Sequence, residues 1–429
     1  MLSTVMALTF GLTVLIGVPI AFSLGLTAVV YIVIWGEVPV TIVAQRMFSG
    51  MDSFPLLAVP FFILSGELMS QGGIMAKLVA FSNALVGHVR GGLAQVNVVG
   101  SMFSSGITGA GVADAAAVGS VLIPAMKREG YDPAFSAAVT AAAAVNGPII
   151  PPSIAMVIYS FAVGGSVSVA ALFAAGFLPG LLIGLGLMAQ NYVIARKQGR
   201  KGGAPFELRR VGVEFKRAFL ALMMPVIILG GILGGICTAT EAAAVAVFYA
   251  AFVGFFITRQ LTMAAMPRIM VRTAVTTSVV LLLMATGRVI SWLLSAQEIP
   301  AGLASFMTSL TDSRMLFLIL CMIFLLVVGC LLDASAALIM LVPILAPIAV
   351  AYDVHPLHFA LLVIVNLSIG MITPPVGVLL FVTCGIAKVS MEAMLKVIWP
   401  YVIMQIALLF VIAFIPEITL VVPRWLGYL

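Results

Sequence analysis

The sequence predicts an all-α polytopic membrane protein, organised as an inverted-topology repeat with two re-entrant hairpins and two broken helices. Three observations predict this class. Of the 429 residues, 63% are hydrophobic and only 8% are charged, whereas a soluble chain carries about 25% charged residues. Apolar runs long enough to cross a bilayer recur along the chain. A set of short motifs also occurs twice, at a nearly constant separation.

Long uncharged runs mark the expected spanning segments, for example residues 1–36, 133–195, 316–332 and 398–416. The first 22 residues lack a basic start and form too long an apolar run for a signal peptide, so we expect the first spanning helix there. The net charge is +6. Because Lys and Arg gather in short loops, this charge sets membrane orientation. We therefore expect the lipid bilayer as the surroundings and no nucleic-acid partner.

The sequence gives little support for an enzyme or for a metal-binding protein. The four cysteines lie in apolar segments without the spacing of metal ligands, and buried free thiols are the default there. His355 and His358 lie one helical turn apart but have no third ligand nearby, which favours a structural role. The chain contains no GxxxxGK[ST] phosphate-binding motif and no group of ionisable residues suited to group transfer. We expect no enzyme and no organic cofactor.

The repeat is visible in paired motifs. Asp114 and Asp333 each precede a proline by ten positions, and each Asp is followed further on by a Tyr-Asp pair, a Pro-Pro pair and a serine. The separations between equivalent positions are 219, 221, 223 and 222 residues. Near-constant separations over such a distance indicate duplication. The two halves cover roughly residues 1–200 and 218–429.

Basic loops orient the two halves in opposite directions. The segment 196–217 is too charged for lipid and is expected to be a cytoplasmic loop. Counting from it, the first hairpin enters from the cytoplasm and turns at SSGITGAG (104–111). The second hairpin, residues 316–350, enters from outside and turns at GCLLDAS (329–335), with Asp312 and Arg314 outside. Residues 73–89 and 299–310 are expected to be equivalent interfacial helices.

This pattern predicts six segments. They are scaffold helices and an arm (1–90), the hairpin and broken helix of repeat 1 (91–166), scaffold helices with the basic linker (167–235), scaffold helices and an arm (236–314), the hairpin and broken helix of repeat 2 (315–388) and a C-terminal scaffold helix (389–429).

The two Pro-Pro pairs break helices, since proline has no N–H and disfavours a helical residue before it. Paired broken helices in an inverted repeat are typical of secondary transporters with a site near the midplane. Exposed carbonyls at a break can coordinate Na⁺, and free amides at a helix start can bind an anion. An ordinary proline kink is the alternative. The candidate residues at the breaks are Asn146, Gly147, Pro148, Ser153, Gly370, Thr373 and Gly377.

The hairpin turns and lone acids supply further candidates. Ser104, Ser105, Gly106 and Thr108 lie at the first turn, where close packing of small residues is the alternative role. Asp333 is isolated in an uncharged stretch, which favours a functional role, and Asp114 is its counterpart. For both aspartates the alternative is capping of the following helix.

Two more ionisable residues stand alone in apolar surroundings. We expect the Glu241 side chain to accept hydrogen bonds from backbone amides at a helix start, which Thr238 or Thr240 would cap. Arg288 is expected to pair with an acid or to contact an anionic substrate.

Five motifs in order resemble the large membrane subunit of tripartite ATP-independent periplasmic (TRAP) transporters. They are SGITGAGVADAAAVGSVLIPAM, GPIIPPSI, GGICTATEAAAVAV, LLDASAALIMLVPILAPIA and NLSIGMITPPVGVLLFV, and with the length they cover essentially the whole chain. The resemblance implies an elevator-type member of the ion transporter superfamily in a bacterial inner membrane. It also implies Na⁺-driven uptake of an organic acid from a periplasmic binding protein. The expected membrane partner is a separate small four-helix subunit.

The resemblance places Na⁺ sites between each hairpin turn and the neighbouring helix break. Carried onto this sequence, the first site comprises Ser104, Ser105 and Gly106 of the hairpin with Asn146, Gly147 and Pro148 of the break. The second site comprises Gly329 and Asp333 of the hairpin with Gly370 and Thr373 of the break. Substrate contacts are expected from Thr108, Ser153, Asn366 and Gly377, and Asp114 and Glu241 are expected to be structural or functional acids. The alternatives are a stand-alone Na⁺- or H⁺-coupled anion symporter and a channel.

Overall fold

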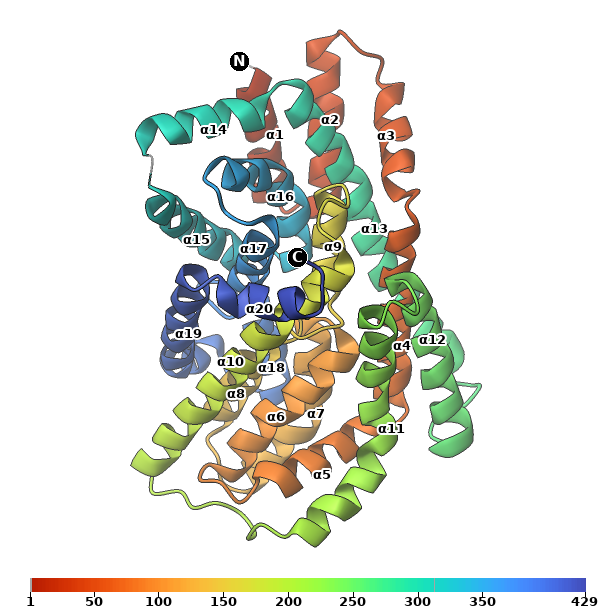
Figure 1. The fold of residues 1–429 in the computed structure, drawn as a ribbon, viewed down its shortest axis with the longest axis vertical. Coiled ribbons are helices and arrows are strands. Elements are labelled where there is room, and N and C mark those ends of the chain that lie inside the picture. Colours follow the sequence, from red (N-terminus) through yellow and green to blue (C-terminus); the bar gives the residue numbers. More distant parts are fainter. Residues whose placement is uncertain (1, 312) are drawn as a thin grey trace.

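The computed structural model describes residues 2–311 and 313–429, and the regular structure within them is helical (Figure 1). Asp312, which the charge pattern places outside the membrane, is not among the described residues. The helices of the first half are α1 (Leu2–Leu15), α2 (Ile20–Trp35), α3 (Thr41–Met51), η1 (Phe54–Leu57), α4 (Ala58–Gln71), α5 (Ile74–Val86), α6 (Gly92–Thr108), α7 (Gly111–Arg128), α8 (Pro133–Ala144), α9 (Ile154–Ala162) and α10 (Val169–Lys197). Those of the second half are α11 (Leu208–Leu233), α12 (Ala239–Phe252), η2 (Val253–Ile257), α13 (Met266–Ala296), α14 (Ile299–Leu310), α15 (Arg314–Leu331), α16 (Ala334–Ala351), α17 (Pro356–Gly370), α18 (Val378–Ala387), α19 (Met391–Phe414) and α20 (Glu417–Trp425).

The described residues include 8 helical segments that are long and apolar enough to cross a membrane. Several shorter apolar helices accompany them, among them α8, α17 and α18. Because backbone polar groups find no water in the bilayer core, helices are the structure expected for these segments. The fold class predicted from composition is therefore confirmed.

The two halves contain matching elements that point in opposite directions. The hairpin α6–α7 with the short helix α5 lies toward one end of the molecule, and the hairpin α15–α16 with α14 lies toward the other (Figure 1). α10 and α19 begin after Ser168 and Ser390, which are separated by 222 positions, and each serine caps its helix. The inverted repeat predicted from sequence spacing is thus present in the fold.

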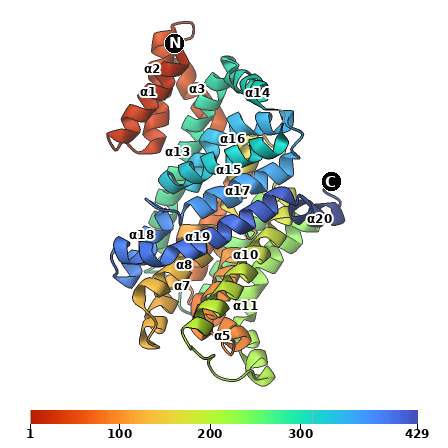
Figure 2. The ribbon, with the colours of Figure 1, turned by 90° about the vertical axis from the view of Figure 1, so that its left-hand side faces the viewer.

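Both predicted broken helices are broken at the Pro-Pro pairs. α8 and α9 are separated by residues 145–153, and α17 and α18 by residues 371–377. The Pro151–Pro152 and Pro374–Pro375 peptide bonds are both cis. Figure 2 shows α17 and α18 as two separate pieces beside the long helix α19. Each broken helix therefore exposes one helix end and one helix start inside the protein.

The first pieces of the two broken helices form the centre of the molecule. Every residue of α8 from Ala134 onward is buried, and so is every residue of α17 from Leu357 onward. α8 is rich in alanine and packs against α6, α7, α18 and α19. Small side chains allow helix backbones to approach closely, which is how membrane helices gain packing energy. Each break therefore begins at the end of a helix that is buried inside the protein.

The expected single spanning helix in residues 1–22 is wrong. The chain instead forms α1, turns, and returns as α2, which packs against it. Gly17 has a φ of 88°, and Pro19 precedes α2 directly. A left-handed glycine followed by a proline ends a helix, because the proline cannot donate to the preceding turn. The apolar run alone did not reveal this turn.

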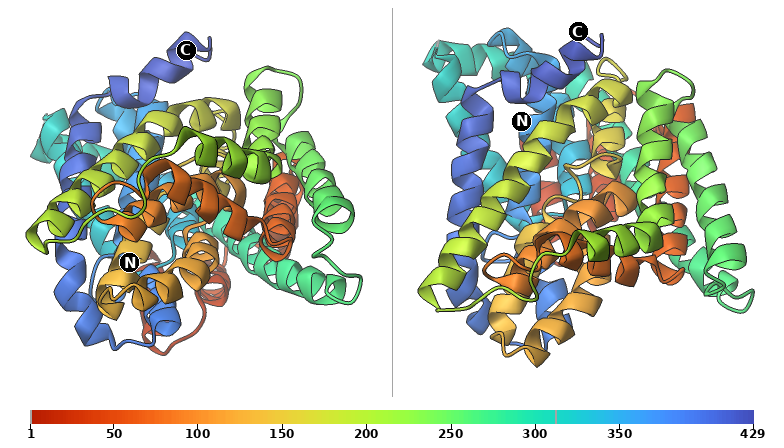
Figure 3. Two further views of the ribbon diagram at one scale, coloured as in Figure 1. Left: turned by 90° about the horizontal axis from the view of Figure 1, so that it is seen from below. Right: turned by 60° about the horizontal axis from the view of Figure 1, so that its bottom comes forward.

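Only part of the basic segment 196–217 forms a loop, whereas the sequence predicts a loop over its whole length. α10 continues through Lys197 and α11 starts at Leu208, so only residues 198–207 form the connection. This connection runs past α5 and α6 at one end of the molecule (Figure 3). There Arg200 Nη2 donates to the carbonyl of Gly130 at 2.7 Å, and Gly203 N donates to the carbonyl of Gly87 at 2.8 Å.

Candidate functional site

The tip of the first hairpin lies against the first helix break. Gly109 and Ala110 form the turn between α6 and α7, within the predicted SSGITGAG segment. Gly109 has a φ of 63°, which glycine adopts without strain. Its carbonyl accepts a hydrogen bond from Ile154 N, the first residue of α9, at 3.1 Å. The tip thus satisfies one of the free amides at the start of that helix.

Gly147 allows the tip and the break to touch. A Cβ at this position would lie 2.6 Å from Gly111 N and 2.8 Å from the carbonyl carbon of Ala110. Real side chains do not tolerate such distances to backbone atoms. Glycine is therefore required here by the close approach of two backbones, and larger residues would separate the break from the tip.

Asp114 is fully buried behind this contact. One of its oxygens, Oδ2, lies 2.8 Å from Ser105 Oγ, and Ser105 Oγ also lies 2.7 Å from the carbonyl of Ser101. The alternative that Asp114 caps its helix is wrong, because Ala110 occupies the N-cap position of α7 and Asp114 lies in the first turn. Its carboxylate faces the hairpin partner α6 instead.

Several buried polar atoms around this tip and break have no hydrogen-bond partner within the described part of the chain. They are the hydroxyl oxygens of Ser101, Ser104 and Thr108, Oδ1 of Asp114, and both side-chain polar atoms of Asn146. Buried polar groups are normally bonded to protein, ordered water or an ion, so a cluster of unbonded ones marks a place where water or an ion can bind. Most of these atoms are oxygens, including a carboxylate, and hard cations prefer oxygen ligands. The donor set therefore fits an alkali cation.

Other predicted residues of the first half have structural partners. Ser153 Oγ donates to the carbonyl of Pro148 at 2.6 Å and accepts from Met156 N, so it closes the break and caps α9. At Gly106 a Cβ would lie 3.2 Å from Pro225 of α11, so Gly106 provides close packing between α6 and α11. Of these two residues, Ser153 holds the break in shape.

The second hairpin meets the second break in an equivalent way. Gly377 N, at the start of α18, donates to the carbonyl of Cys330 at 3.1 Å. A Cβ on Gly370 would lie 2.6 Å from the Cα and carbonyl carbon of Gly329. A Cβ on Gly329 would in turn lie 3.1 Å from Leu367. The predicted glycines therefore come together, with hairpin and break in backbone contact.

Side chains at the second break differ from those at the first. Asp333 caps α16, because its carboxylate accepts a hydrogen bond from Ser335 N at 2.9 Å. Thr373 donates to the carbonyl of Ile369. Asn366 is buried and donates to the carbonyl of Met322 at 3.0 Å, while its Oδ1 has no hydrogen-bond partner among the described residues. The capping alternative is thus confirmed for Asp333.

Glu241 forms the capping box expected at the start of α12. Its carboxylate accepts hydrogen bonds from Thr238 N and Thr238 Oγ1, both at 2.8 Å, and its own N–H donates to Thr238 Oγ1. Glu241 is exposed at the end of the helix. It lies in a different part of the fold from the hairpin tips, and these bonds assign it a structural role at the helix start.

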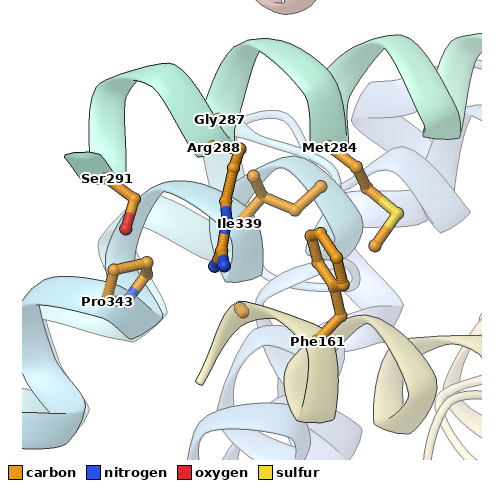
Figure 4. Close-up of a pocket in the computed structure, with 8 residues that line it drawn as sticks. Phe161, Met284, Gly287, Arg288, Ser291, Ile339 and Pro343 are labelled. Atoms are coloured by element: carbon orange, nitrogen blue, oxygen red, sulfur yellow. The ribbon is translucent and has the colours of Figure 1, made fainter. Parts of the chain in front are cut away.

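A cavity lies between α13, α9 and α16 (Figure 4). Its volume is about 10 Å³, which is room for about one water molecule. Figure 4 shows Arg288 reaching from α13 into the space between Phe161 of α9 and Ile339 of α16. Its guanidinium carbon lies 5.5 Å from the centre of the Phe161 ring. Arg288 forms no ion pair with any described residue.

Sequence reasoning missed part of this arrangement. Ser101 is one helical turn before Ser105 and faces the same buried cluster, a position that the i, i+4 spacing could have indicated. The neighbours of Arg288 come from helices more than 50 residues away in the chain, so no local pattern indicates them. No group of three or more His, Cys, Asp or Glu that could hold a metal occurs in the described ranges.

An inverted repeat in which two hairpins meet two broken helices is the architecture of a polytopic secondary transporter. The sequence model of the family described as "Tripartite ATP-independent periplasmic transporter, DctM component" matches residues 7–418. The chain therefore belongs to this family, as the sequence motifs predict.

Several named permeases are similar to the chain over most of its length. The isethionate TRAP transporter permease protein DctMQ of Oleidesulfovibrio alaskensis is 40% identical over 95% of this chain, which spans 64% of that protein. The C4-dicarboxylate TRAP transporter large permease protein DctM of Pseudomonas aeruginosa is 39% identical, covering 94% of each chain. The sialic acid TRAP transporter large permease protein SiaM of Vibrio cholerae is 37% identical, covering 96% of each. These names describe transporter permeases and not enzymes.

One solved structure also resembles the fold. The Alcanivorax borkumensis YdaH transporter, described as having an unusual topology, superposes with a TM-score of 0.59 over 87% of each chain at 14% sequence identity. At this identity the likeness concerns the fold alone.

Proposed function

We propose that the protein carries out Na⁺-coupled uptake of an organic acid across a bacterial inner membrane by an elevator-type movement. In this proposal the substrate arrives on a periplasmic binding protein, and a small four-helix membrane subunit accompanies the chain. The family supports transport, and the named relatives support an organic acid, because they are permeases for isethionate, sialic acid and C4-dicarboxylates.

The observation that carries the proposal is the cluster of unbonded buried oxygens at the first hairpin tip. Asp114, Ser101, Ser104, Thr108 and Asn146 would surround a Na⁺ ion there. A bound ion would supply positive charge to the buried carboxylate, which is otherwise expensive to keep inside a membrane protein. Placing the ion between the hairpin and the break would lock these segments together when it binds.

At the second hairpin the proposal relies mainly on backbone groups. Asp333 and Thr373 already use side-chain oxygens in local hydrogen bonds. Carbonyls around Gly329 and Gly370 lie close together, and unwound carbonyls are the usual ligands of coupling Na⁺ ions in broken-helix transporters. We therefore expect a second Na⁺ site with fewer side-chain ligands than the first.

Elevator movement requires two bodies. We assign the hairpins and broken helices, residues 91–166 and 315–388, to the moving body and the remaining helices to the scaffold. The cavity next to Arg288 supports this division, because its walls come from scaffold helix α13 and from α9 and α16 of the moving body. When the two bodies move apart, Arg288 would supply the counter-charge to a carboxylate between them.

Uptake into proteoliposomes tests the proposal. The vesicles would hold this chain with its small subunit, and the purified binding protein loaded with mixed organic acids would be added outside. We expect uptake only with an inward Na⁺ gradient and the binding protein. Na⁺-driven uptake without the binding protein would favour a stand-alone symporter, and no Na⁺ dependence with folded protein would refute the ion sites.

A matched pair of variants sharpens the test. Asp114→Asn removes the buried carboxylate while keeping its size, whereas Glu392→Gln removes an exposed carboxylate at the start of α19. The Na⁺-dependent rise in melting temperature, measured against K⁺, should be lost only in Asp114→Asn. This readout reports ion binding without requiring transport.

A further inference from the structure

The start of α11 carries basic side chains directly before a membrane span. α11 is one of the helices that are long and apolar enough to cross a membrane, and its charged residues all lie between Arg209 and Arg217. The rest of the helix, from Ala218 to Leu233, is uncharged. At 1.5 Å per residue this part is about 24 Å long, which is less than the roughly 30 Å of a bilayer core. The charged turns therefore begin at the membrane surface.

Contacts with α5 determine which face of α11 points outward. Phe215 packs against Phe81 of α5, with ring centres 5.8 Å apart, and Ala218, about one turn further on, is buried. The ring centre of Phe206, just before the helix, lies 5.2 Å from that of His88. Figure 1 shows α11 beginning beside α5 at one end of the molecule. The opposite face of these first turns points away from the protein.

Unpaired cations lie on this outward part of α11. Three of its basic side chains are exposed and form no ion pair with any described residue, and together they are called the basic face: Arg209, Arg210 and Lys216. At 100° per residue, Arg209 and Lys216 lie directly opposite the buried Ala218. Glu214 is already engaged by Arg217 at 2.8 Å, and Glu207, which precedes the helix, is the other acid of this segment. Unpaired positive charge therefore exceeds negative charge there.

Exposed apolar side chains lie among these cations. Leu208 is 75% exposed, Val213 44% and Phe219 45%. Val213 is one helical turn from both Arg209 and Lys216, so a single face is basic and apolar at once. The boundary between lipid headgroups and acyl chains suits such a face, because cations can reach the phosphates while apolar groups contact the chains.

We infer that the basic face binds the phosphate groups of anionic phospholipids at the membrane surface. Charge complementarity favours this partner, since Lys and Arg just outside a spanning helix attract acidic headgroups. The forked N–H groups of Arg209 and Arg210 also match the geometry of phosphate oxygens. The inference does not depend on Na⁺ coupling or on the transported acid, so it can fail while the proposed function holds.

Lipid titration of the purified full chain in detergent tests the inference. Phosphatidylglycerol, phosphatidylcholine and inorganic phosphate are added separately, and the rise in melting temperature gives each apparent affinity. We expect phosphatidylglycerol to stabilise the protein most. The triple variant Arg209→Gln/Arg210→Gln/Lys216→Gln should lower the apparent affinity for phosphatidylglycerol at least about tenfold. Its response to phosphatidylcholine should not change.

A matched control removes the same number of exposed cations from the neighbouring connection. Arg196→Gln/Lys197→Gln/Lys201→Gln leaves α11 intact, so phosphatidylglycerol binding should be retained. Equal melting temperatures in phosphatidylcholine show that the variants are folded. If the first triple variant does not fold, Arg209→Gln/Arg210→Gln carries the same prediction with a smaller loss of affinity.

Several results would overturn the inference. One is phosphatidylglycerol binding by the α11 triple variant that equals that of the unchanged protein. Another is an equal loss in the control variant, because any surface cation would then serve. A response to inorganic phosphate as large as that to phosphatidylglycerol would assign the basic face to a free anion instead. Loss of the small membrane subunit from the purified variant, with lipid binding unchanged, would assign the face to that protein.

Discussion

Substitution of Gly370 by alanine should uncouple the second hairpin from its helix break. A Cβ there would lie 2.6 Å from Gly329 Cα and carbonyl carbon, whereas ordinary contacts begin near 3.4 Å. The two backbones would have to separate by roughly 0.8 Å, since neither contact atom is a movable side chain. Overpacking of this kind costs about 1–3 kcal/mol of stability.

The same shift is large compared with the tolerance of an ion site. Coordination distances are maintained within about 0.2 Å, so a 0.8 Å separation would remove carbonyls of one segment from the ion. We expect Na⁺ affinity to fall roughly 10- to 100-fold. The hydrogen bond from Gly377 N to the Cys330 carbonyl should weaken as well, because it joins the same two segments.

The assay is a Na⁺ titration of the melting temperature of the purified protein, followed by uptake in proteoliposomes. Gly385→Ala is the matched control, because it lies in the same half and a Cβ there meets no heavy atom within 4 Å. Gly147→Ala makes the equivalent change at the first break, at 2.6 Å from Gly111 N. Wild-type Na⁺ dependence in Gly370→Ala would refute the reasoning.

Substitutions at three further positions separate ligand roles from structural roles. Asp114→Asn should weaken the apparent Na⁺ affinity of uptake at least about tenfold, measured by Na⁺ titration, because the buried carboxylate loses its charge. Asp333→Asn should retain both stability and Na⁺ dependence, since asparagine caps helices as well as aspartate does, whereas Asp333→Ala should cost about 1 kcal/mol by thermal unfolding. Glu241→Ala should lower the melting temperature without changing transport kinetics, because it removes the acceptor of the Thr238 N–H, and Glu241→Gln should restore the capping box.

The architecture could be predicted where local chemistry determines it. Pro-Pro pairs break helices wherever they occur, and paired offsets of 219 to 223 positions reveal the duplication. The expected interfacial segment 299–310 is α14, and the segment 73–89 contains α5. Turns of both hairpins also fall inside the predicted segments. These features depend on residues that are close in sequence.

The rest depends on contacts between distant segments. The approach of Gly329 to Gly370 and the position of Arg288 against Phe161 arise only when helices pack. The different roles of Asp114 and Asp333 also escaped prediction, because both precede runs of alanine in the sequence. Asp333 directly precedes its helix and caps it, while Asp114 comes four residues into the helix region and faces Ser105. A shift of a few positions relative to the helix start separates a cap from a buried charge.

The two halves share their backbone contacts more closely than their side chains. Ile154 N donates to the Gly109 carbonyl in one half, and Gly377 N donates to the Cys330 carbonyl in the other, at the same 3.1 Å. A free amide at a helix start must find a partner inside a membrane protein, and each hairpin tip supplies one. Because backbone groups make this contact, side chains at the two tips were free to diverge. The acid at the first tip is accordingly buried against Ser105, whereas its counterpart at the second tip caps a helix, so the two equivalent breaks present unequal side chains.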